Sequence, residues 1–137
     1  MYPPELVQPM KEDLTSVGFN QLTSASEVDE LIENSGESLL MVVNSVCGCA
    51  AGNMRPGVKI SITNAKVPTT LATVFAGVDG EATQQARKHF LPYPPSSPSI
   101  ALFKDGKLVH FLERHHIEGS TAEMIAENLA GAYNEYC

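Results

Sequence analysis

The feature that most constrains the fold is a buried-strand pattern that leads directly into a pair of cysteines. Residues 39–44, LLMVVN, form an apolar run, and the next residues, 45–52, are mostly small, SVCGCAAG. An apolar run rich in β-branched residues is typical of a strand that is buried on both faces of a sheet. A second such strand is predicted over residues 71–78, and a helix over residues 81–90 follows it. Because strand–helix–strand order requires parallel neighbours joined by right-handed crossovers, the chain is predicted to form an α/β fold.

The remaining segments extend this architecture at both ends. Spaced apolar residues predict one helix within residues 1–20 and another that begins near Ser24 or Ser26 and ends at Gly36. Residues 99–104 and 107–113, separated by Asp-Gly, predict an antiparallel hairpin. A final helix is expected to open with the capping box at residues 120–123, STAE. We therefore expect one domain over residues 1–137, with a mixed sheet of about four strands and helices on both faces.

The charge balance argues against two classes of partner, and the N-terminus argues against secretion. Nine Lys and Arg against sixteen Asp and Glu give a net charge of −7. This charge repels phosphate backbones and anionic lipid, so neither a nucleic acid nor a membrane is an expected partner. The first residues, MYPPELVQPMKEDL, lack the basic start and apolar run of a secretory signal. The longest apolar run is far shorter than the roughly 20 residues that span a bilayer, and we expect a cytoplasmic protein.

The three cysteines point to thiol chemistry. Cys47 and Cys49 are separated only by Gly48, and Cys137 is the last residue. An odd number of cysteines in a cytoplasmic chain indicates redox chemistry or metal binding rather than a structural disulfide framework. Free backbone N–H groups and the positive end of a helix dipole stabilise a thiolate, so Cys47, where strand meets helix, is the candidate nucleophile. Cys49 is placed to attack the first sulfur once it has formed a mixed disulfide.

The spacing of the pair predicts a labile bridge. Side chains at positions i and i+2 of a regular helix point to nearly opposite sides, so Cys47 and Cys49 cannot be joined in that geometry. Gly48 frees the backbone to bring them together, at a cost in strain. Such a disulfide is easily reduced and is therefore expected to be catalytic. Pro56 would clash with the carbonyl of Gly52, so the helix is expected to bend or restart there.

Two other interpretations of the pair remain open. Cysteines also serve as small buried hydrophobic residues at a strand end. They also bind metals, but two thiolates supply only half of a structural zinc site, and no second cysteine pair follows. His115 and His116 are the remaining candidate ligands, although we expect both in an exposed turn before the final helix. Cys137 lies at the far end of that helix of ~16 residues, or ~24 Å, and is not expected to resolve an intermediate within the chain.

Several blocks of the sequence, in order, resemble the bacilliredoxins, a thioredoxin-like family that uses Cys-Gly-Cys. The matching stretches are VNSVCGCAAG at 43–52, RP at 55–56, TVFAG at 73–77, PSSPS at 95–99 and IEG at 117–119, together with Cys137. The resemblance implies a thioredoxin-like three-layer fold. It also implies that the bond from Ser97 to Pro98 is cis and that this loop lies against the active-site sulfur, although Pro98 could instead be an ordinary turn proline.

The family resemblance implies a thiol–disulfide oxidoreductase that acts on bacillithiol, a low-molecular-weight thiol. Cys47 would attack the mixed disulfide of a client protein and take the bacillithiol, and Cys49 or a second bacillithiol would release it. Gly48, Ser97 and Pro98 would shape the substrate groove. The implied partners are S-bacillithiolated client proteins, bacillithiol and a recycling thiol reductant, with no resident cofactor or metal.

Arg55 and the wider activity each have a second interpretation. Arg55 is either a solvated cation two helical turns beyond Cys47, or a substrate-binding group that attracts the thiolate and the carboxylates of bacillithiol. A general disulfide isomerase would use the same cysteines on unfolded proteins, and a metal carrier would use them as ligands.

Overall fold

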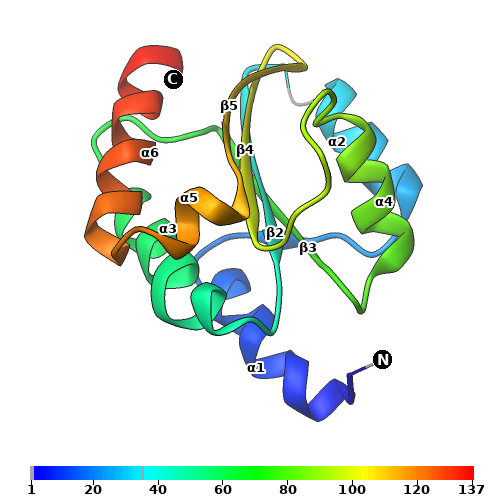
Figure 1. The fold of residues 1–137 in the computed structure, drawn as a ribbon. Coiled ribbons are helices and arrows are strands. Elements are labelled where there is room, and N and C mark those ends of the chain that lie inside the picture. The colour runs from blue at the N-terminus through cyan, green and yellow to red at the C-terminus, as the bar shows by residue number, and fades with distance from the viewer. Residues whose placement is uncertain (1, 35) are drawn as a thin grey trace.

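The computed structural model describes residues 2–34 and 36–137 and places a five-stranded mixed sheet between two layers of helices (Figure 1). The strand order is β1-β3-β2-β4-β5. Strands β1 and β2 are parallel to β3, and β4 is antiparallel to both β2 and β5. Their bounds are β1 Asn20–Gln21, β2 Ser38–Asn44, β3 Thr70–Phe75, β4 Ser99–Lys104 and β5 Lys107–Leu112. The predicted three-layer α/β fold is confirmed, with one strand more than the sequence indicated.

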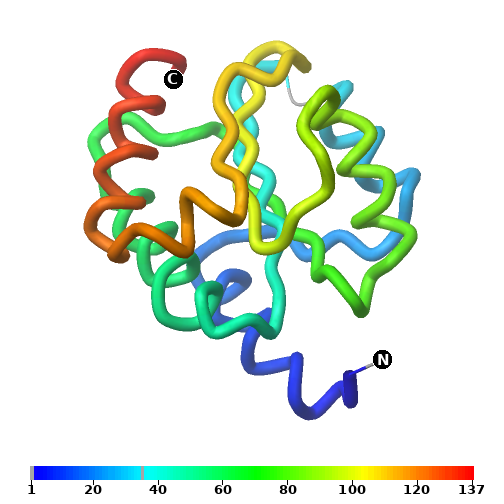
Figure 2. The backbone as a smooth tube through the Cα atoms, in the orientation of Figure 1, coloured from blue at the N-terminus to red at the C-terminus, as the bar shows by residue number. Residues whose placement is uncertain are grey.

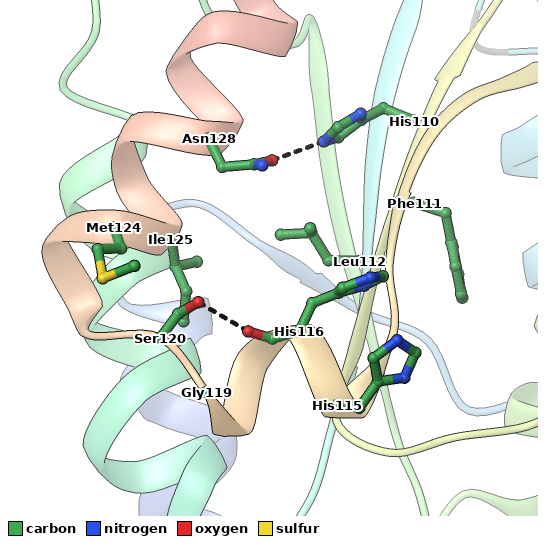
Figure 3. A pocket seen from close by; sticks show the side chains of 10 residues that line it. All are labelled: His110, Phe111, Leu112, His115, His116, Gly119, Ser120, Met124, Ile125 and Asn128. Atoms are coloured by element: carbon green, nitrogen blue, oxygen red, sulfur yellow. Dashed lines mark hydrogen bonds between the residues drawn. The ribbon is translucent and has the colours of Figure 1, made fainter.

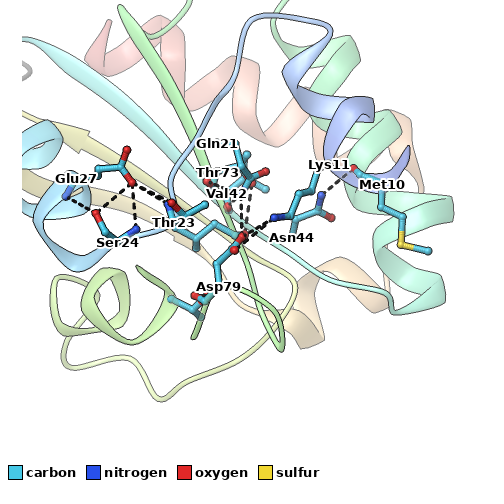
Figure 4. Close-up of polar contacts among 12 residues, drawn as sticks. Met10, Lys11, Gln21, Thr23, Ser24, Glu27, Val42, Asn44, Thr73 and Asp79 are labelled. Carbon is cyan, nitrogen blue, oxygen red and sulfur yellow. Dashed lines mark hydrogen bonds and ion pairs between the residues drawn. The ribbon is translucent and has the colours of Figure 1, made fainter. Parts of the chain in front are cut away.

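The additional strand, β1, is a two-residue edge strand that pairs with β3 and is also tied to its neighbours by side chains. The amide of Gln21 donates to the carbonyl of Thr73, at 3.3 Å, and to Asp79, at 3.1 Å (Figure 4). Lys11 forms an ion pair with the same Asp79, at 3.0 Å. Two residues are too few to show an alternating pattern, which is why the sequence did not reveal this strand.

The helices divide between the two faces of the sheet. Helices α3 and α6 cover one face, and α2 and α4 cover the other (Figures 1 and 2). The helices are α1 Pro4–Thr15, α2 Ala25–Asn34, the π-helical turn η1 Ala50–Met54, α3 Arg55–Ser61, α4 Gly80–Lys88, α5 Arg114–Glu118 and α6 Ala122–Tyr136. Among the described residues, no helix has the length and apolar character needed to span a bilayer.

Three details at the helix ends correct or refine the sequence interpretation. The hydroxyl of Ser24, not Ser26, accepts a bond from the N–H of Glu27 at the start of α2. Thr121, not Ser120, caps α6, since its hydroxyl accepts from the N–H of Met124 at 3.2 Å. His115 and His116, expected in an exposed turn before α6, are exposed as predicted but lie in the short helix α5. The one-residue shift of the cap of α6 is typical of helix ends.

The central strand β2 is buried along its whole length and contributes to two separate cores. Leu40 and Val42 pack under α3 and α6, in a cluster that also contains Met54, Val58, Leu129 and Tyr133. Leu39, Met41 and Val43 pack on the other face, in a cluster that also contains Val28, Ile32, Ala82, Ala86 and Phe90. Because successive side chains of a strand point to opposite faces, this pattern fixes the register of β2. The carboxyl end of β2 is therefore anchored in the central strand of the sheet, between the two cores.

Helices α3 and α6 pack closely at a glycine. A Cβ atom added to Gly57 would lie 2.9 Å from the carbonyl oxygen of Ala122 and 2.9 Å from Cβ of Ile125. At a glycine the backbones of the two helices can approach more closely than any side chain would permit. This contact holds the segment that follows the cysteines against the sheet.

Candidate active site

Cys47 lies where β2 passes into the helical segment that follows it. The strand ends at Asn44, and the helical turn begins at Gly48. The carbonyl of Cys47 accepts hydrogen bonds from the N–H groups of Ala50, at 2.9 Å, and Ala51, at 3.2 Å. Cys47 thus occupies the strand–helix junction that the sequence predicted.

A buried polar network supports this junction from below. The side chain of Asn44 accepts from the N–H of Ser45, at 2.9 Å, and from Nη1 of Arg55, at 2.9 Å, while its amide donates to the carbonyl of Met10 (Figure 4). Arg55 also donates to the carbonyl of Ser45, at 3.0 Å, and pairs with Asp13, at 3.2 Å. The network fixes the chain immediately before the first cysteine.

The position of Arg55 corrects one expectation and weakens another. Its side chain is only 4% exposed, so the expectation of a solvated cation is wrong. Arg55 does not line the pocket around Cys47, so the described contacts give it a structural place beneath the loop. The sequence could not show this, because the carboxylate that neutralises the guanidinium belongs to Asp13, on the distant helix α1.

The predicted bend at Pro56 takes the form of a π-helical turn. In η1 the N–H of Arg55 donates to the carbonyl of Ala50, five residues earlier. A π-turn inside a helix inserts one extra residue and shifts the following register. The segment therefore passes from the cysteines into α3 with Pro56 near the beginning of that helix, where its missing N–H is tolerated.

The sulfur of Cys47 is surrounded by hydrogen-bond donors. It accepts from the N–H of Cys49, at 3.4 Å, and from Nη2 of Arg114, at 3.3 Å. A hydrogen bond from the thiol of Cys49 lowers the pKa of Cys47 most, and the N–H of Cys49, the charge of Arg114 and the N–H of Ala50 lower it further, against a smaller opposing effect of burial. Burial, the hydrogen bond to Cys47 and the negative charge of Cys47 together raise the pKa of Cys49 to about 11. The pKa of Cys47 is thus lowered while that of Cys49 is raised, so Cys47 loses its proton before Cys49 does.

Arg114 is the functional residue that sequence reasoning missed. It is the first residue of α5, and its guanidinium also donates to the carbonyl of Ser97, at 3.2 Å, and pairs with Glu118. Asn53 in turn ties the end of α5 to η1 by donating to the carbonyls of Ile117 and Ser120. The predicted hairpin held the clue to this position. Because β4 and β5 are antiparallel, the residues just before β4 and just after β5 must lie side by side.

The sulfur of Cys47 opens onto a pocket of about 530 Å³. Its lining includes Ser97, Arg87 and Arg114. The bond from Ser97 to Pro98 is cis, as the family resemblance implied, and Pro98 itself is buried and does not line this pocket. Gly48 is exposed beside the site, with open space where a Cβ would be. A pocket of this size has room for a small-molecule thiol as well as for a client cysteine.

The histidines and Cys137 lie apart from the pair. His115 and His116 group with Glu113, with potential ligand atoms within 4.8 Å of one another, and no cysteine joins this group of described residues. The two histidines line a different pocket, between β5 and α6 (Figure 3). Cys137 follows α6 at the opposite end of the molecule from the carboxyl end of β2 (Figure 1). All three cysteines are partly buried and free, so Cys47 and Cys49 are not simply small core residues.

Solved structures identify the fold as that of thioredoxin. The chain superimposes on mitochondrial thioredoxin 3 of Saccharomyces cerevisiae with a TM-score of 0.58, at 19% identity, over 90% of this chain and 98% of that one. The oxidised thioredoxin of Plasmodium falciparum gives a TM-score of 0.56, at 20% identity, over 82% and 99%. The protein therefore has a thioredoxin-like fold with a cysteine pair at the head of a helix, an arrangement suited to thiol–disulfide exchange.

Comparison with characterised families narrows this class. Residues 2–137 match the model of a family described as "Disulphide isomerase". The chain is 57% identical to a bacilliredoxin of Cytophaga hutchinsonii over 135 residues, which cover 98% of this chain and 99% of that protein. It is 48% identical to a bacilliredoxin of Halalkalibacterium halodurans, over 99% and 94% of the two chains. The chain therefore belongs to the bacilliredoxin family.

Proposed function

We propose that this protein removes bacillithiol from S-bacillithiolated protein cysteines in the cytoplasm, with Cys47 as the nucleophile. The observation that carries the proposal is the sulfur of Cys47, which accepts hydrogen bonds from Arg114 and the N–H of Cys49 and opens onto a pocket. Such surroundings lower the pKa of the Cys47 thiol and favour the thiolate, which is the nucleophilic form. The names of the relatives support bacillithiol as the small thiol.

The first step exchanges one disulfide for another. The Cys47 thiolate attacks the bacillithiol sulfur of the client's mixed disulfide, the bond to the client sulfur breaks, and the client cysteine leaves as a thiolate. Cys47 then carries the bacillithiol as a mixed disulfide. Electrons are conserved, because one thiolate and one disulfide are consumed and one of each is formed.

The second step releases bacillithiol. Either a second bacillithiol attacks the bacillithiol sulfur, which forms bacillithiol disulfide and frees the Cys47 thiolate, or Cys49 attacks the sulfur of Cys47 and expels bacillithiol. Attack by Cys49 leaves a Cys47–Cys49 disulfide that a recycling thiol reductant must reduce. The pKa of Cys49 is about 11 partly because of the adjacent negative charge of Cys47. That charge disappears when Cys47 enters a disulfide, so Cys49 becomes easier to deprotonate when its attack is required. Gly48 and the Ser97 backbone beside Pro98 would accommodate the movement and the incoming disulfide, and no resident cofactor is needed.

A general disulfide isomerase is the second candidate function. The description of the matching family model favours it, and it would use the same nucleophile on scrambled protein disulfides. The two functions differ in substrate, not in the attacking residue.

Intact mass spectrometry on the reduced Cys49→Ala, Cys137→Ala variant distinguishes these functions. The variant is mixed with a bacillithiolated model protein, and Cys47→Ala serves as the control that cannot accept the adduct. We expect bacillithiol on Cys47 and an equal amount of freed client thiol. If the client stays modified while the variant forms mixed disulfides with scrambled proteins, the isomerase function is correct and our proposal is not.

A further inference from the structure

The pocket around Cys47 concentrates positive charge in an acidic protein. The chain has a net charge of −7, yet two of its three arginines, Arg87 and Arg114, line this pocket. Arg114 is already engaged with Glu118, the carbonyl of Ser97 and the sulfur of Cys47. Arg55, the third arginine, is neutralised by Asp13 beneath the loop. Arg87 is therefore the cation of the pocket whose partner is not evident.

The contacts of Arg87 leave its charge uncompensated. Within residues 2–34 and 36–137, no carboxylate lies within 4.0 Å of its guanidinium, and its one hydrogen bond is to the carbonyl of Ser96, at 3.5 Å. Its Nε is inaccessible to solvent and has no acceptor in the described part of the chain. Burial lowers the pKa of Arg87, since the guanidinium has lost water without gaining an anion.

A partly desolvated guanidinium gains more free energy from binding an anion than a fully hydrated guanidinium does. Buried polar groups in native proteins nearly always have partners, so an unpartnered one calls for an explanation, and a bound ion is one of them. A carboxylate in the pocket would form a charge-assisted hydrogen bond to a group that is already held in place by α4. Lys88, the next residue, is exposed and offers the same charge without this desolvation.

We propose that Arg87 is an anion-binding residue of the Cys47 pocket, and that it binds a carboxylate on the low-molecular-weight half of the mixed disulfide. This inference rests on the proposed exchange at Cys47 and adds the chemical class that the pocket selects. The pocket favours disulfides of acidic small thiols over those of neutral ones. Arg114 stabilises the thiolate, and Arg87 holds the substrate.

Two disulfide probes that differ in charge test this assignment on the reduced full-length protein. Dithiobis(nitrobenzoate) carries carboxylates, and dithiodipyridine is neutral. In both reactions the Cys47 thiolate attacks one probe sulfur, forms a mixed disulfide with it and expels the other half as a thiolate, which is followed by stopped-flow absorbance. We expect Arg87→Gln to lower the ratio of the anionic to the neutral rate constant by about fivefold to tenfold. The control Lys88→Gln removes the same charge and should leave the ratio within about twofold, because an exposed charge is screened by salt.

The alternative outcomes overturn the proposal. An unchanged ratio in Arg87→Gln, or an equal fall in Lys88→Gln, shows that no local carboxylate site exists. If circular dichroism shows that Arg87→Gln does not fold, the wild type is tested directly. Succinate must then slow the reaction of Cys47 with dithiodipyridine more than succinamide does at equal ionic strength, and equal rates refute the site.

Failure of the proposed function gives a different result. If wild-type protein takes no bacillithiol from a modified client but Arg87→Gln still lowers the probe ratio, the anion site stands and the bacillithiol substrate does not. If bacillithiol is transferred to Cys47 but the ratio is unchanged in Arg87→Gln, the bacillithiol substrate stands and the anion site does not.

Discussion

Substitution of Gly57 by alanine tests the close packing of α3 against α6, which holds the segment after the cysteines in place. The new Cβ would lie 2.9 Å from the carbonyl oxygen of Ala122 and 2.9 Å from both Cβ and Cγ2 of Ile125. Cβ atoms do not approach other heavy atoms this closely in real structures. Two of these three contacts are to a backbone oxygen and a Cβ atom, so the helices themselves must separate.

Two opposing effects set the size of the change. Alanine favours a helix over glycine by about 0.5–1 kcal/mol. Inserting a methyl group into a tightly packed contact costs about 1–3 kcal/mol. Taking the middle of each range, the net result is a loss of about 1.3 kcal/mol in the free energy of unfolding, which corresponds to a fall of roughly 4–5 °C in the unfolding temperature of a chain of this size.

Gly131→Ala in α6 is the matched control. Gly131 is exposed, and no heavy atom lies within 4 Å of its added Cβ. The Gly131→Ala variant should be more stable than the wild type by the helix preference of alanine alone, about 0.5–1 kcal/mol in the free energy of unfolding. The difference between the two variants therefore isolates the steric cost at Gly57. Thermal and urea unfolding followed by circular dichroism measure both. If Gly57→Ala unfolds at or above the wild-type temperature while Gly131→Ala shows its gain, the helices have room and our account of this interface is refuted.

Three further predictions concern the cysteine pair, and all are measured with the reduced protein unless stated. Iodoacetamide at neutral pH should label Cys47 and spare Cys49, because the pKa of Cys47 is lowered and that of Cys49 is about 11. Peptide mass spectrometry locates the label, and equal labelling of the two cysteines would contradict the choice of Cys47 as the nucleophile. Arg114→Gln and Cys49→Ala should each raise the pKa of Cys47, so its alkylation rate should fall severalfold at about pH 6 and recover at alkaline pH, where the thiolate forms in any case. The midpoint should move further for Cys49→Ala, which removes the largest cause of the lowering, and the opposite order would show that the guanidinium dominates. Gly48→Ala should change the unfolding temperature by no more than about 2 °C, because the added Cβ contacts no other group. It should nevertheless slow closure of the Cys47–Cys49 disulfide severalfold relative to the control Gly52→Ala, as measured by quenched alkylation during oxidation. Equal closure rates in the two variants would mean that the flexibility of Gly48 is not needed.

The sequence by itself determined the elements that depend on local chemistry. The apolar run of β2, the turn at Asp105 and Gly106 and the break at Pro56 all reflect preferences of a few adjacent residues, and the structure has each of them. The placement of Cys47 between a strand and a helix follows from the same local signals. The sequence therefore indicated both the fold class and the candidate nucleophile.

Only the tertiary structure decided which cationic side chain lies beside the sulfur of Cys47. The nearby Arg55 is buried against Asp13, whereas Arg114, 67 residues beyond Cys47, donates to its sulfur because the β4–β5 hairpin returns the chain to the active-site end of the sheet. Arg87 reaches the same pocket from the end of α4, a helix on the other face. The field at a sulfur depends on distances in space, and these are set by strand order and helix packing rather than by separation along the chain.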